Sequence, residues 1–209
     1  MNLDKEMEKG LNEKYSILRA EISKLDNAVV AFSGGIDSAL VLKVAFDILK
    51  DKVIAVTADS PSLPRNELDE AKKIACEIGA RHEIINTEET KNEEYLKNPG
   101  NRCYFCKTEL YTKLEIFATT NGFTNILNGT NKDDTSDYRP GLKAADEHKV
   151  ISPLRDSNLT KSEVRGIAKS LNLTIWEKPS SPCLSSRVPY GQAITMKKLK
   201  MIESFTSSQ

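Results

Sequence analysis

The sequence is poor in the features that mark several classes of protein. It holds only 4 Cys in 209 residues, too few for a disulfide scaffold. With 10 Gly, 8 Pro and 39% hydrophobic residues, a folded core is expected rather than disorder. No stretch approaches the ~20 apolar residues of a membrane span, and the first residues are charged where a signal peptide is apolar. These absences predict a soluble, cytoplasmic protein with no membrane partner.

An excess of charge of either sign is also missing. Lys plus Arg number 30 and Asp plus Glu number 30, so the formal net charge is zero. Without a global positive field, long polyanions such as nucleic acids are poor candidates as partners. The balance favours small molecules instead.

The chain alternates short β-branched runs with helical patterns. It opens with an amphipathic helix, because apolar residues recur there at spacings of three and four: Leu11, Tyr15, Leu18, Ile22 and Leu25. Strands are expected at 28–32, 53–58, 82–85, 125–127 and 150–152. Helices are expected at about 64–78, 108–120 and 194–205, with another after the capping-box pattern at 160–163. The pattern predicts an α/β fold, an open parallel five-stranded Rossmann-like sheet with helices on both faces.

A glycine turn between the first strand and the next helix carries the first chemical signal. Its sequence, SGGIDS, spans residues 33–38 and follows a buried strand directly. Two glycines let the backbone approach oxygen atoms, and the free amides and dipole of a helix start favour an anion. The lysine of a Walker A loop and the third glycine of a dinucleotide motif are both missing. The turn predicts a phosphate site of another kind, with an ordinary tight turn as the alternative.

Three of the four cysteines have the spacing of metal-binding or catalytic thiols. Cys103 and Cys106 are three residues apart, which lets both face one metal or cluster. Cys183 lies in the aperiodic stretch 177–192. Three ligands would leave one position open on an iron–sulfur cluster or on zinc, whereas the alternative makes the pair half-buried helix residues and leaves Cys183 acting alone. Cys76 is expected to pack on the apolar face of its helix.

The SGGIDS turn resembles the PP-loop of N-type ATP pyrophosphatases, which cleave ATP between the α and β phosphates. The resemblance implies that the loop holds the β and γ phosphates, through Ser33, Gly34, Gly35, Asp37 and Ser38. It implies catalytic roles for Ser33 and Asp37, with Asp37 helping to place Mg²⁺. It also implies that the adenine lies against Ala31, Thr57, Ala58 and Gly129.

Taken in order, several motifs resemble the LarE family of sulfur transferases over nearly the whole chain: SGGIDS, NRCYFCK, GTNKDDTSDYRPGLKA, LTKSEVR and KPSSPCLSSRVPYG. The resemblance implies that residues 1–193 form a PP-loop ATP pyrophosphatase domain. Residues 194–209 would begin a C-terminal domain that is truncated or absent. Family members use that domain in assembly, so the homo-oligomer that the resemblance implies depends on its presence.

The resemblance also implies a reaction. ATP would adenylate a carboxylate of pyridinium-3,5-biscarboxylic acid mononucleotide, and sulfur would then displace AMP to give a thiocarboxylate for nickel-pincer cofactor synthesis. One branch of the family sacrifices the sulfur of the cysteine that matches Cys183. Another branch, which carries the CxxC pair, is held to donate sulfide from a 4Fe-4S cluster. Cys103, Cys106 and Cys183 place the sequence in the second branch, with a sulfide or sulfur donor protein as a further partner.

Cations for the substrate and ligands for Mg²⁺ have weaker signals. Arg139, Arg155 and Arg187 are candidates for binding its phosphate or carboxylate, because a guanidinium fork matches either group. Asp133 and Asp134 are candidate Mg²⁺ ligands, with a solvated acidic turn as the alternative.

The two histidines, His82 and His148, show no partner pattern and are expected at the solvated surface. Arg102 and Lys107 flank the cysteine pair and would favour thiolates.

The rival function is a tRNA thiolase that uses the same CxxC pair and distant cysteine. A nucleotide- and zinc-binding module without catalysis is the alternative from another class.

Overall fold

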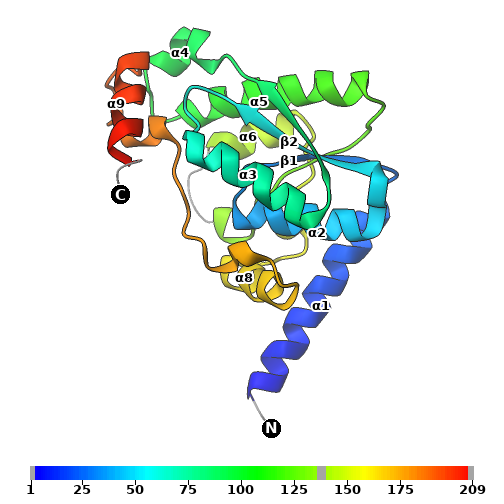
Figure 1. Cartoon of the computed structure of the whole chain (residues 1–209). Coiled ribbons are helices and arrows are strands. Elements are labelled where there is room, and N and C mark those ends of the chain that lie inside the picture. The colour runs from blue at the N-terminus through cyan, green and yellow to red at the C-terminus, as the bar shows by residue number, and fades with distance from the viewer. Residues whose placement is uncertain (1–2, 136–139, 207–209) are drawn as a thin grey trace.

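The computed structural model describes residues 3–135 and 140–206, and it shows a parallel sheet covered by helices on both faces (Figure 1). The strands lie in the order β3-β2-β1-β4, and each neighbouring pair is parallel. Their bounds are β1 Ala28–Ala31, β2 Val53–Asp59, β3 Arg81–Asn86 and β4 Ile126–Leu127. The predicted α/β fold class with an open parallel sheet is therefore confirmed.

The strand predicted at 150–152 is reduced to one parallel bridge. Ile151 pairs with Leu127, and its carbonyl accepts a hydrogen bond from the Asn128 amide at 3.0 Å. Pairing stops there because Ser152 is already the N-cap residue of helix α7 (Pro153–Asp156), whose proline suits a helix start and has no amide for a ladder. Over the described ranges the sheet has four strands instead of the five expected.

Alternate residues of the central strands bury against different helices, because successive side chains of a strand point to opposite faces. Val30 and Ala55 belong to the core on one face, whereas Val29 and Ile54 belong to the core on the other. The first core includes residues of α1 Leu3–Ser23, α2 Ile36–Leu49, α3 Arg65–Ile78 and α8 Lys161–Ser170. The second core includes residues of α5 Arg102–Thr120 and α6 Pro140–Glu147.

The expected amphipathic helix at the start of the chain is confirmed in α1. Leu18 and Ile22 are fully buried, and Leu11, Tyr15 and Leu25 pack partly against the same core. Each fully buried side chain of this size contributes about 2 kcal/mol of hydrophobic free energy. The end of α1 is thereby fixed beside α2, while its first turns extend away from the sheet (Figure 1).

Cys76 contradicts its sequence-based prediction. It is exposed, because the buried stripe of α3 runs through Ile74, Ala75 and Ile78 and leaves position 76 on the solvent side. The prediction relied on apolar residues at every second position, Ile74, Cys76 and Ile78. That spacing does not keep side chains on one face of a helix.

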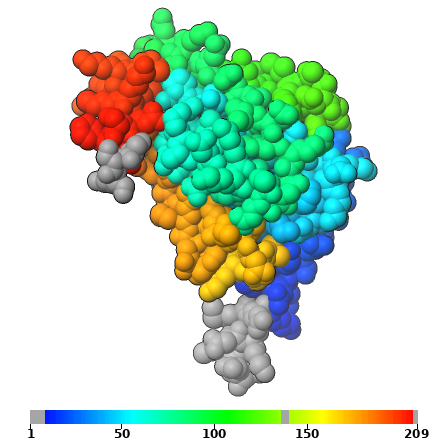
Figure 2. All heavy atoms as spheres, in the orientation of Figure 1, coloured from blue at the N-terminus to red at the C-terminus, as the bar shows by residue number. Residues whose placement is uncertain are grey.

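The last helix, α9 Met196–Thr206, lies at one corner of the molecule beside the surface formed by residues near 60 (Figure 2). It buries Leu199 in a small cluster with Tyr95, Leu184 and Ile194. The predicted domain boundary after residue 193 stays a prediction.

The remaining short elements are η1 Lys50–Lys52, η2 Glu89–Lys91, α4 Glu93–Leu96, η3 Asp133–Thr135, η4 Thr174–Glu177 and η5 Leu184–Arg187. No helix in the described parts of the chain is long and apolar enough to cross a bilayer.

Candidate functional site

The phosphate loop lies between the end of β1 and the start of α2. Gly34 has a φ of 70°, and a Cβ there would lie 2.9 Å from the Cβ of Ala71, so the position requires glycine. Ser38 Oγ donates to the Gly35 carbonyl at 3.0 Å and lies 3.2 Å from Ser33 Oγ. These hydroxyls hold the turn, while the first-turn amides of α2 have no acceptor within the helix. The local geometry is that of an anion site at a helix N-terminus.

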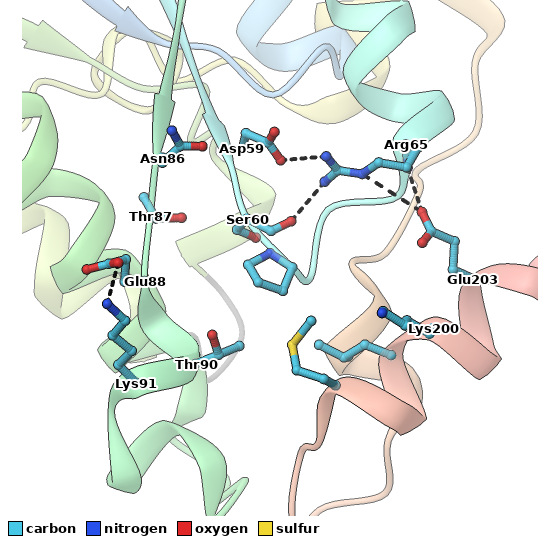
Figure 3. Close-up of a pocket in the computed structure, with 13 residues that line it drawn as sticks. Asp59, Ser60, Arg65, Asn86, Thr87, Glu88, Thr90, Lys91, Lys200 and Glu203 are labelled. Atoms are coloured by element: carbon cyan, nitrogen blue, oxygen red, sulfur yellow. Dashed lines mark hydrogen bonds and ion pairs between the residues drawn. The ribbon is translucent and has the colours of Figure 1, made fainter.

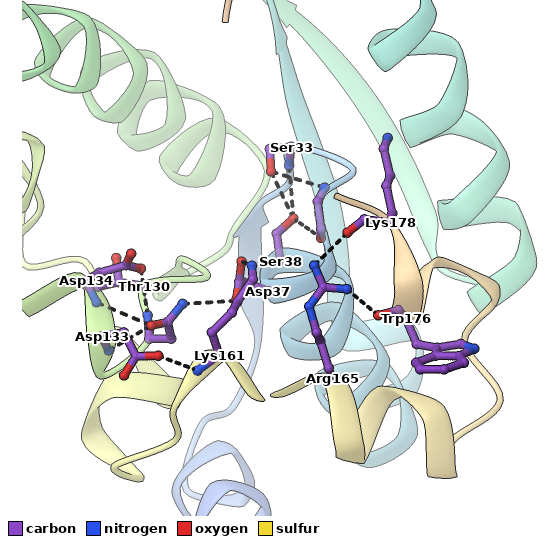
Figure 4. Close-up of polar contacts among 12 residues, drawn as sticks. Ser33, Asp37, Ser38, Thr130, Asp133, Asp134, Lys161, Arg165, Trp176 and Lys178 are labelled. Carbon is purple, nitrogen blue, oxygen red and sulfur yellow. Dashed lines mark hydrogen bonds and ion pairs between the residues drawn. The ribbon is translucent and has the colours of Figure 1, made fainter. Parts of the chain in front are cut away.

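The loop after β4 approaches the start of α2 closely, and Gly129 makes this approach possible. A Cβ at residue 129 would lie 2.6 Å from the amide nitrogen of Ser38. Just beyond it, Asn131 Nδ2 donates to Asp37 Oδ1 at 3.1 Å, and the Lys161 ammonium pairs with Asp37 Oδ2 (Figure 4). Asp37 is thus held by an amide and an ammonium from two other segments.

Sequence reasoning missed Asn131 and Lys161. Lys161 is the first residue of α8, whose predicted capping box is confirmed: the amide of Thr160 donates to Glu163 Oε2 at 2.8 Å, and Thr160 Oγ1 accepts from the Glu163 amide. The capping pattern fixed the helix start but gave no sign that the next residue reaches the phosphate loop. The structure supplies that information by packing α8 against α2.

Asp133 and Asp134 lie in the turn that Asn131 organises. The amide of Asn131 donates to Asp134 Oδ2 at 3.1 Å, and the amide of Lys161 donates to Asp133 Oδ2 at 2.9 Å. Asp134 lines the same cavity as Asp37, whereas Asp133 does not. Mg²⁺ is usually bound by one or two carboxylates together with phosphate oxygens, and Asp37 and Asp134 are carboxylates that line the same cavity as the phosphate loop.

A cavity of about 660 Å³ joins the phosphate loop to the cysteine helix. Its size is typical of small-molecule sites. On one side it is lined by Ala31, Ser33, Asp37, Ser38, Gly129 and Thr130. On the other it is lined by Cys103, Lys107, Tyr111, Gly141 and Tyr190. The structure therefore brings most of the predicted phosphate-loop residues and one predicted thiol to a single space.

Two of the residues predicted to contact adenine lie outside the lining of this cavity. Thr57 is buried, and its hydroxyl donates to the Phe32 carbonyl at 2.8 Å; Ala58 follows it in β2. His82 Nε2 lies 2.8 Å from Thr57 Oγ1. Because the single hydroxyl proton is used on Phe32, the imidazole is the donor in this contact.

The expectation that both histidines are solvated is wrong. Burial lowers the pKa of His82, whose ring also meets Phe32 edge to face. His148 Nδ1 lies 2.9 Å from Glu115 Oε1. Both partners come from other elements, so no local pattern could have revealed them.

The cysteine pair lies at the start of α5, which begins six residues before the predicted helix. Cys103 is exposed and lines the cavity, whereas Cys106 is half-buried against Tyr95 and Leu184. Burial raises the pKa of Cys106 to about 12, and the negative charge of Glu89 acts in the same direction. Cys183 is exposed and directly precedes η5, whose first residue, Leu184, belongs to the cluster against which Cys106 packs.

These thiols do not form a preassembled metal site. Among residues 3–135 and 140–206, no three Cys, His, Asp or Glu side chains are grouped so as to hold a metal ion. Lys107 lines the cavity beside Cys103, and its pKa is raised chiefly by the Tyr111 hydroxyl, so it remains a cation.

The predicted arginines have different surroundings. Arg187 is exposed on η5, and its side chain has no ion-pair partner in the described structure. Arg155 already pairs with Asp146 at 3.3 Å and with Asp156 at 3.0 Å. Arg139 lies outside the described residues.

A second cavity of about 430 Å³ lies at the carboxyl ends of β2 and β3, against α9 (Figure 3). The Arg65 guanidinium in its wall donates to Asp59 at 2.6 Å and to the Ser60 carbonyl at 2.9 Å. Its backbone amide donates to Glu203 of α9 at 2.9 Å. These donors are used within the protein, and neither the phosphate loop nor a cysteine lines this space.

Comparison with known proteins shows which family the chain belongs to. A family model described as NAD synthase matches residues 11–189. The chain is 40% identical over 186 residues to the pyridinium-3,5-bisthiocarboxylic acid mononucleotide synthase of Lactiplantibacillus plantarum, covering 88% of this chain and 67% of that protein. It is 47% identical over 192 residues to an uncharacterized protein of Synechocystis sp., covering 92% of this chain and 72% of that protein.

A solved structure supports the fold. The NMN synthetase from Francisella tularensis matches with a TM-score of 0.66 at 18% identity, covering 95% of this chain and 87% of that one. The PP-loop and the LarE resemblance read from the motifs are both borne out by these relatives. The chain thus belongs to the NAD synthase-like family of ATP-dependent PP-loop enzymes, and it is 40% identical to a LarE-type synthase.

Proposed function

We propose that the protein activates a carboxylate of a pyridinium dicarboxylate mononucleotide with ATP and replaces a carboxylate oxygen by sulfur. The observation that carries the proposal is the single cavity lined by the phosphate loop on one side and by Cys103 on the other. The 40% identity to a bisthiocarboxylic acid mononucleotide synthase supports the substrate class. The function needs an ATP site and a sulfur site that face one acceptor.

The first step is adenylation. A substrate carboxylate oxygen attacks the α phosphorus of ATP, the bond from that phosphorus to the bridging oxygen breaks, and pyrophosphate leaves. Ser33, Ser38 and the first-turn amides of α2 would hold the departing phosphates, and Lys161 would neutralise their charge. Asp37 and Asp134 would hold Mg²⁺, which supplies charge neutralisation on the phosphate oxygens when bound.

The second step is sulfur transfer. A hydrosulfide held at the thiols forms a bond to the acyl carbon, the carbon–oxygen bond to AMP breaks, and AMP leaves with the electron pair. Sulfide from outside the protein is the co-reactant, so all three cysteines are retained after turnover. Lys107 at the cysteine end, and Arg187 on the η5 turn that follows Cys183, would bind anionic groups of the substrate.

The 4Fe-4S cluster that the family resemblance implies is a separate hypothesis. Three thiolates and one open iron would suit a donated sulfide, but the thiols as placed form no metal-holding group within the described ranges. No step above depends on the cluster. Iron and acid-labile sulfide contents of protein purified without oxygen, with the ultraviolet–visible spectrum, distinguish a cluster from zinc or bare thiols.

Measuring the two steps separately tests the proposed function. Purified protein is given ATP, the dicarboxylate mononucleotide and sulfide, and both pyrophosphate and thiocarboxylate are quantified. Cys103→Ala, Cys106→Ala and Cys183→Ala should keep pyrophosphate release and lose the thiocarboxylate, since the thiols act after adenylation. Cys76→Ala, an exposed thiol on α3, is the matched control and should keep both products. Thiocarboxylate formation that survives all three changes would refute the role of the thiols.

A further inference from the structure

We propose that a polar clamp fixes Cys183 in position relative to the cysteine pair of α5. The clamp consists of three buried side chains that lie just before the pair in the chain: Tyr95, Asn98 and Arg102. They are positioning residues, because they contact the segment that follows Cys183 and none of them lines the cavity. The inference rests on the proposed function only in assuming that the three thiols work at one place.

Asn98 is the centre of the clamp. It is fully buried with a φ of 52°, and its Nδ2 lies within 3.2 Å of the carbonyls of Val188, Pro189 and Gln192. Its own carbonyl accepts from the Gly191 amide at 2.9 Å. Since a buried amide is stable only with hydrogen-bond partners, Asn98 and the segment 188–192 hold each other in place.

Arg102 extends the clamp toward the thiols. It is 3% exposed, and its Nη1 donates to Asn98 Oδ1 and to the Ser185 carbonyl, both at 2.7 Å. Its other terminal nitrogen lies 4.0 Å from Cys103 Sγ, and its guanidinium lies 5.6 Å from the ring centre of Tyr190. In the described parts of the chain this buried cation has neutral oxygen acceptors and no carboxylate in an ion pair. Its position therefore depends on the loop that carries Ser185.

Tyr95 holds the same loop from the other side. Its hydroxyl lies 2.6 Å from Ser185 Oγ, and its ring packs with Leu184 and Cys106. Ser185 is thus fixed through its side chain by Tyr95 and through its carbonyl by Arg102, two residues after Cys183. The adjacent Leu184 amide donates to the Ser62 carbonyl at 2.9 Å. The exposed Cys183 is therefore anchored by buried contacts of its neighbours.

Thiol cross-linking measures the position of Cys183 without any turnover. The experiment uses the full chain with Cys76→Ser, which removes the remaining exposed thiol, and dibromobimane, a short reagent that bridges two nearby thiols. Mass spectrometry of the peptides quantifies bridges from Cys183 to α5. The Cys103–Cys106 bridge lies within one helix and serves as an internal reference.

Two variants and one control separate positioning from folding. Asn98→Gly keeps the left-handed backbone but loses the side chain, and Tyr95→Phe removes only the hydroxyl contact with Ser185. Asn172→Gly is the matched control, because Asn172 is an exposed asparagine with a φ of 56° in the turn after α8. Tyr95→Phe keeps the test informative if Asn98→Gly does not fold.

The clamp predicts that the parent forms bridges from Cys183. Asn98→Gly should lower their yield at least about fivefold and Tyr95→Phe about twofold, with the Cys103–Cys106 bridge and substrate-dependent pyrophosphate release unchanged. Asn172→Gly should match the parent. Absence of Cys183 bridges in the parent, unchanged yields in both variants, or an equal loss of both kinds of bridge would overturn the clamp. Failure of the proposed function would appear separately, as missing thiocarboxylate in a protein whose bridges are intact.

Discussion

The two ends of the cavity are built in different ways. At the phosphate end, the hydroxyl and carbonyl contacts that shape the turn lie within residues 33–38. At the cysteine end, the ordering contacts join residues 90 apart, such as Asn98 and Val188. The first end depends on local backbone geometry and close approach, and the second on buried hydrogen bonds between distant segments. The phosphate end should therefore be sensitive to one added atom, and the cysteine end to one lost polar partner.

The largest effect is expected from Gly129→Ala. The new Cβ would lie 2.6 Å from the Ser38 amide nitrogen, so the loop after β4 must move away from the start of α2. Because a displacement of about 1 Å at an active site costs on the order of 100-fold, substrate-dependent pyrophosphate release should fall at least about 100-fold. A pyrophosphate assay under saturating ATP measures this.

Gly10→Ala is the matched control for that change. Gly10 lies in α1 with nothing within 4 Å of its added Cβ, so the substitution should raise the free energy of unfolding by about 0.5–1 kcal/mol and leave activity unchanged. Near-normal turnover in Gly129→Ala would mean that the close approach is not needed for catalysis.

A smaller loss is expected from Lys161→Met. This change removes the ammonium paired with Asp37 and one positive charge beside the phosphates, so pyrophosphate release should fall about 10- to 100-fold. Lys169→Met on the same helix removes an ammonium that lies over the Trp176 ring, away from the loop, and should leave the rate unchanged. Steady-state kinetics with varied ATP compares the two. Equal rates would remove Lys161 from the phosphate site.

The smallest effect concerns pH and stability. The pKa of His82 is lowered by burial from its usual 6.5, so below about pH 6.5 the unfolded chain takes up a proton that the folded chain does not. Stability should therefore fall as the pH decreases below that value. His82→Gln keeps a donor for Thr57 without titrating. It should therefore remove this part of the pH dependence of the free energy of unfolding, measured from urea unfolding curves at pH values from 7.5 to 5.5. An unchanged pH dependence would show that His82 is not responsible.

Much of the fold could be predicted from the sequence because it follows local periodicity. The strands at the centre of the sheet, the amphipathic α1 and the capping box of α8 each depend on residues within a few positions of one another. The fifth strand could not be assigned correctly, since its pairing is limited by the helix that begins at Pro153. The apolar residues of this segment alone do not indicate that a helix start ends the pairing.

The candidate site likewise has one part that could be predicted from the sequence and one part that could not. The phosphate loop was recognisable because glycines, hydroxyls and a helix start lie together in six residues. Lys161 and Asn131 reach Asp37 only through tertiary packing, so their spacing held no signal. His82 and the clamp residue Asn98 were likewise hidden, because their partners lie on other elements.

The account is tested most directly by mass spectrometry after a single anaerobic turnover. Protein is supplied with ATP, sulfide and pyridinium-3,5-biscarboxylic acid mononucleotide, and the reaction is quenched. The masses of the nucleotide product and of the peptide that contains Cys183 are then measured in the same sample. The account predicts a thiocarboxylate formed in step with AMP, with Cys183 still a cysteine. A nucleotide that gains no sulfur, or dehydroalanine at Cys183 in amounts equal to the product, would contradict it.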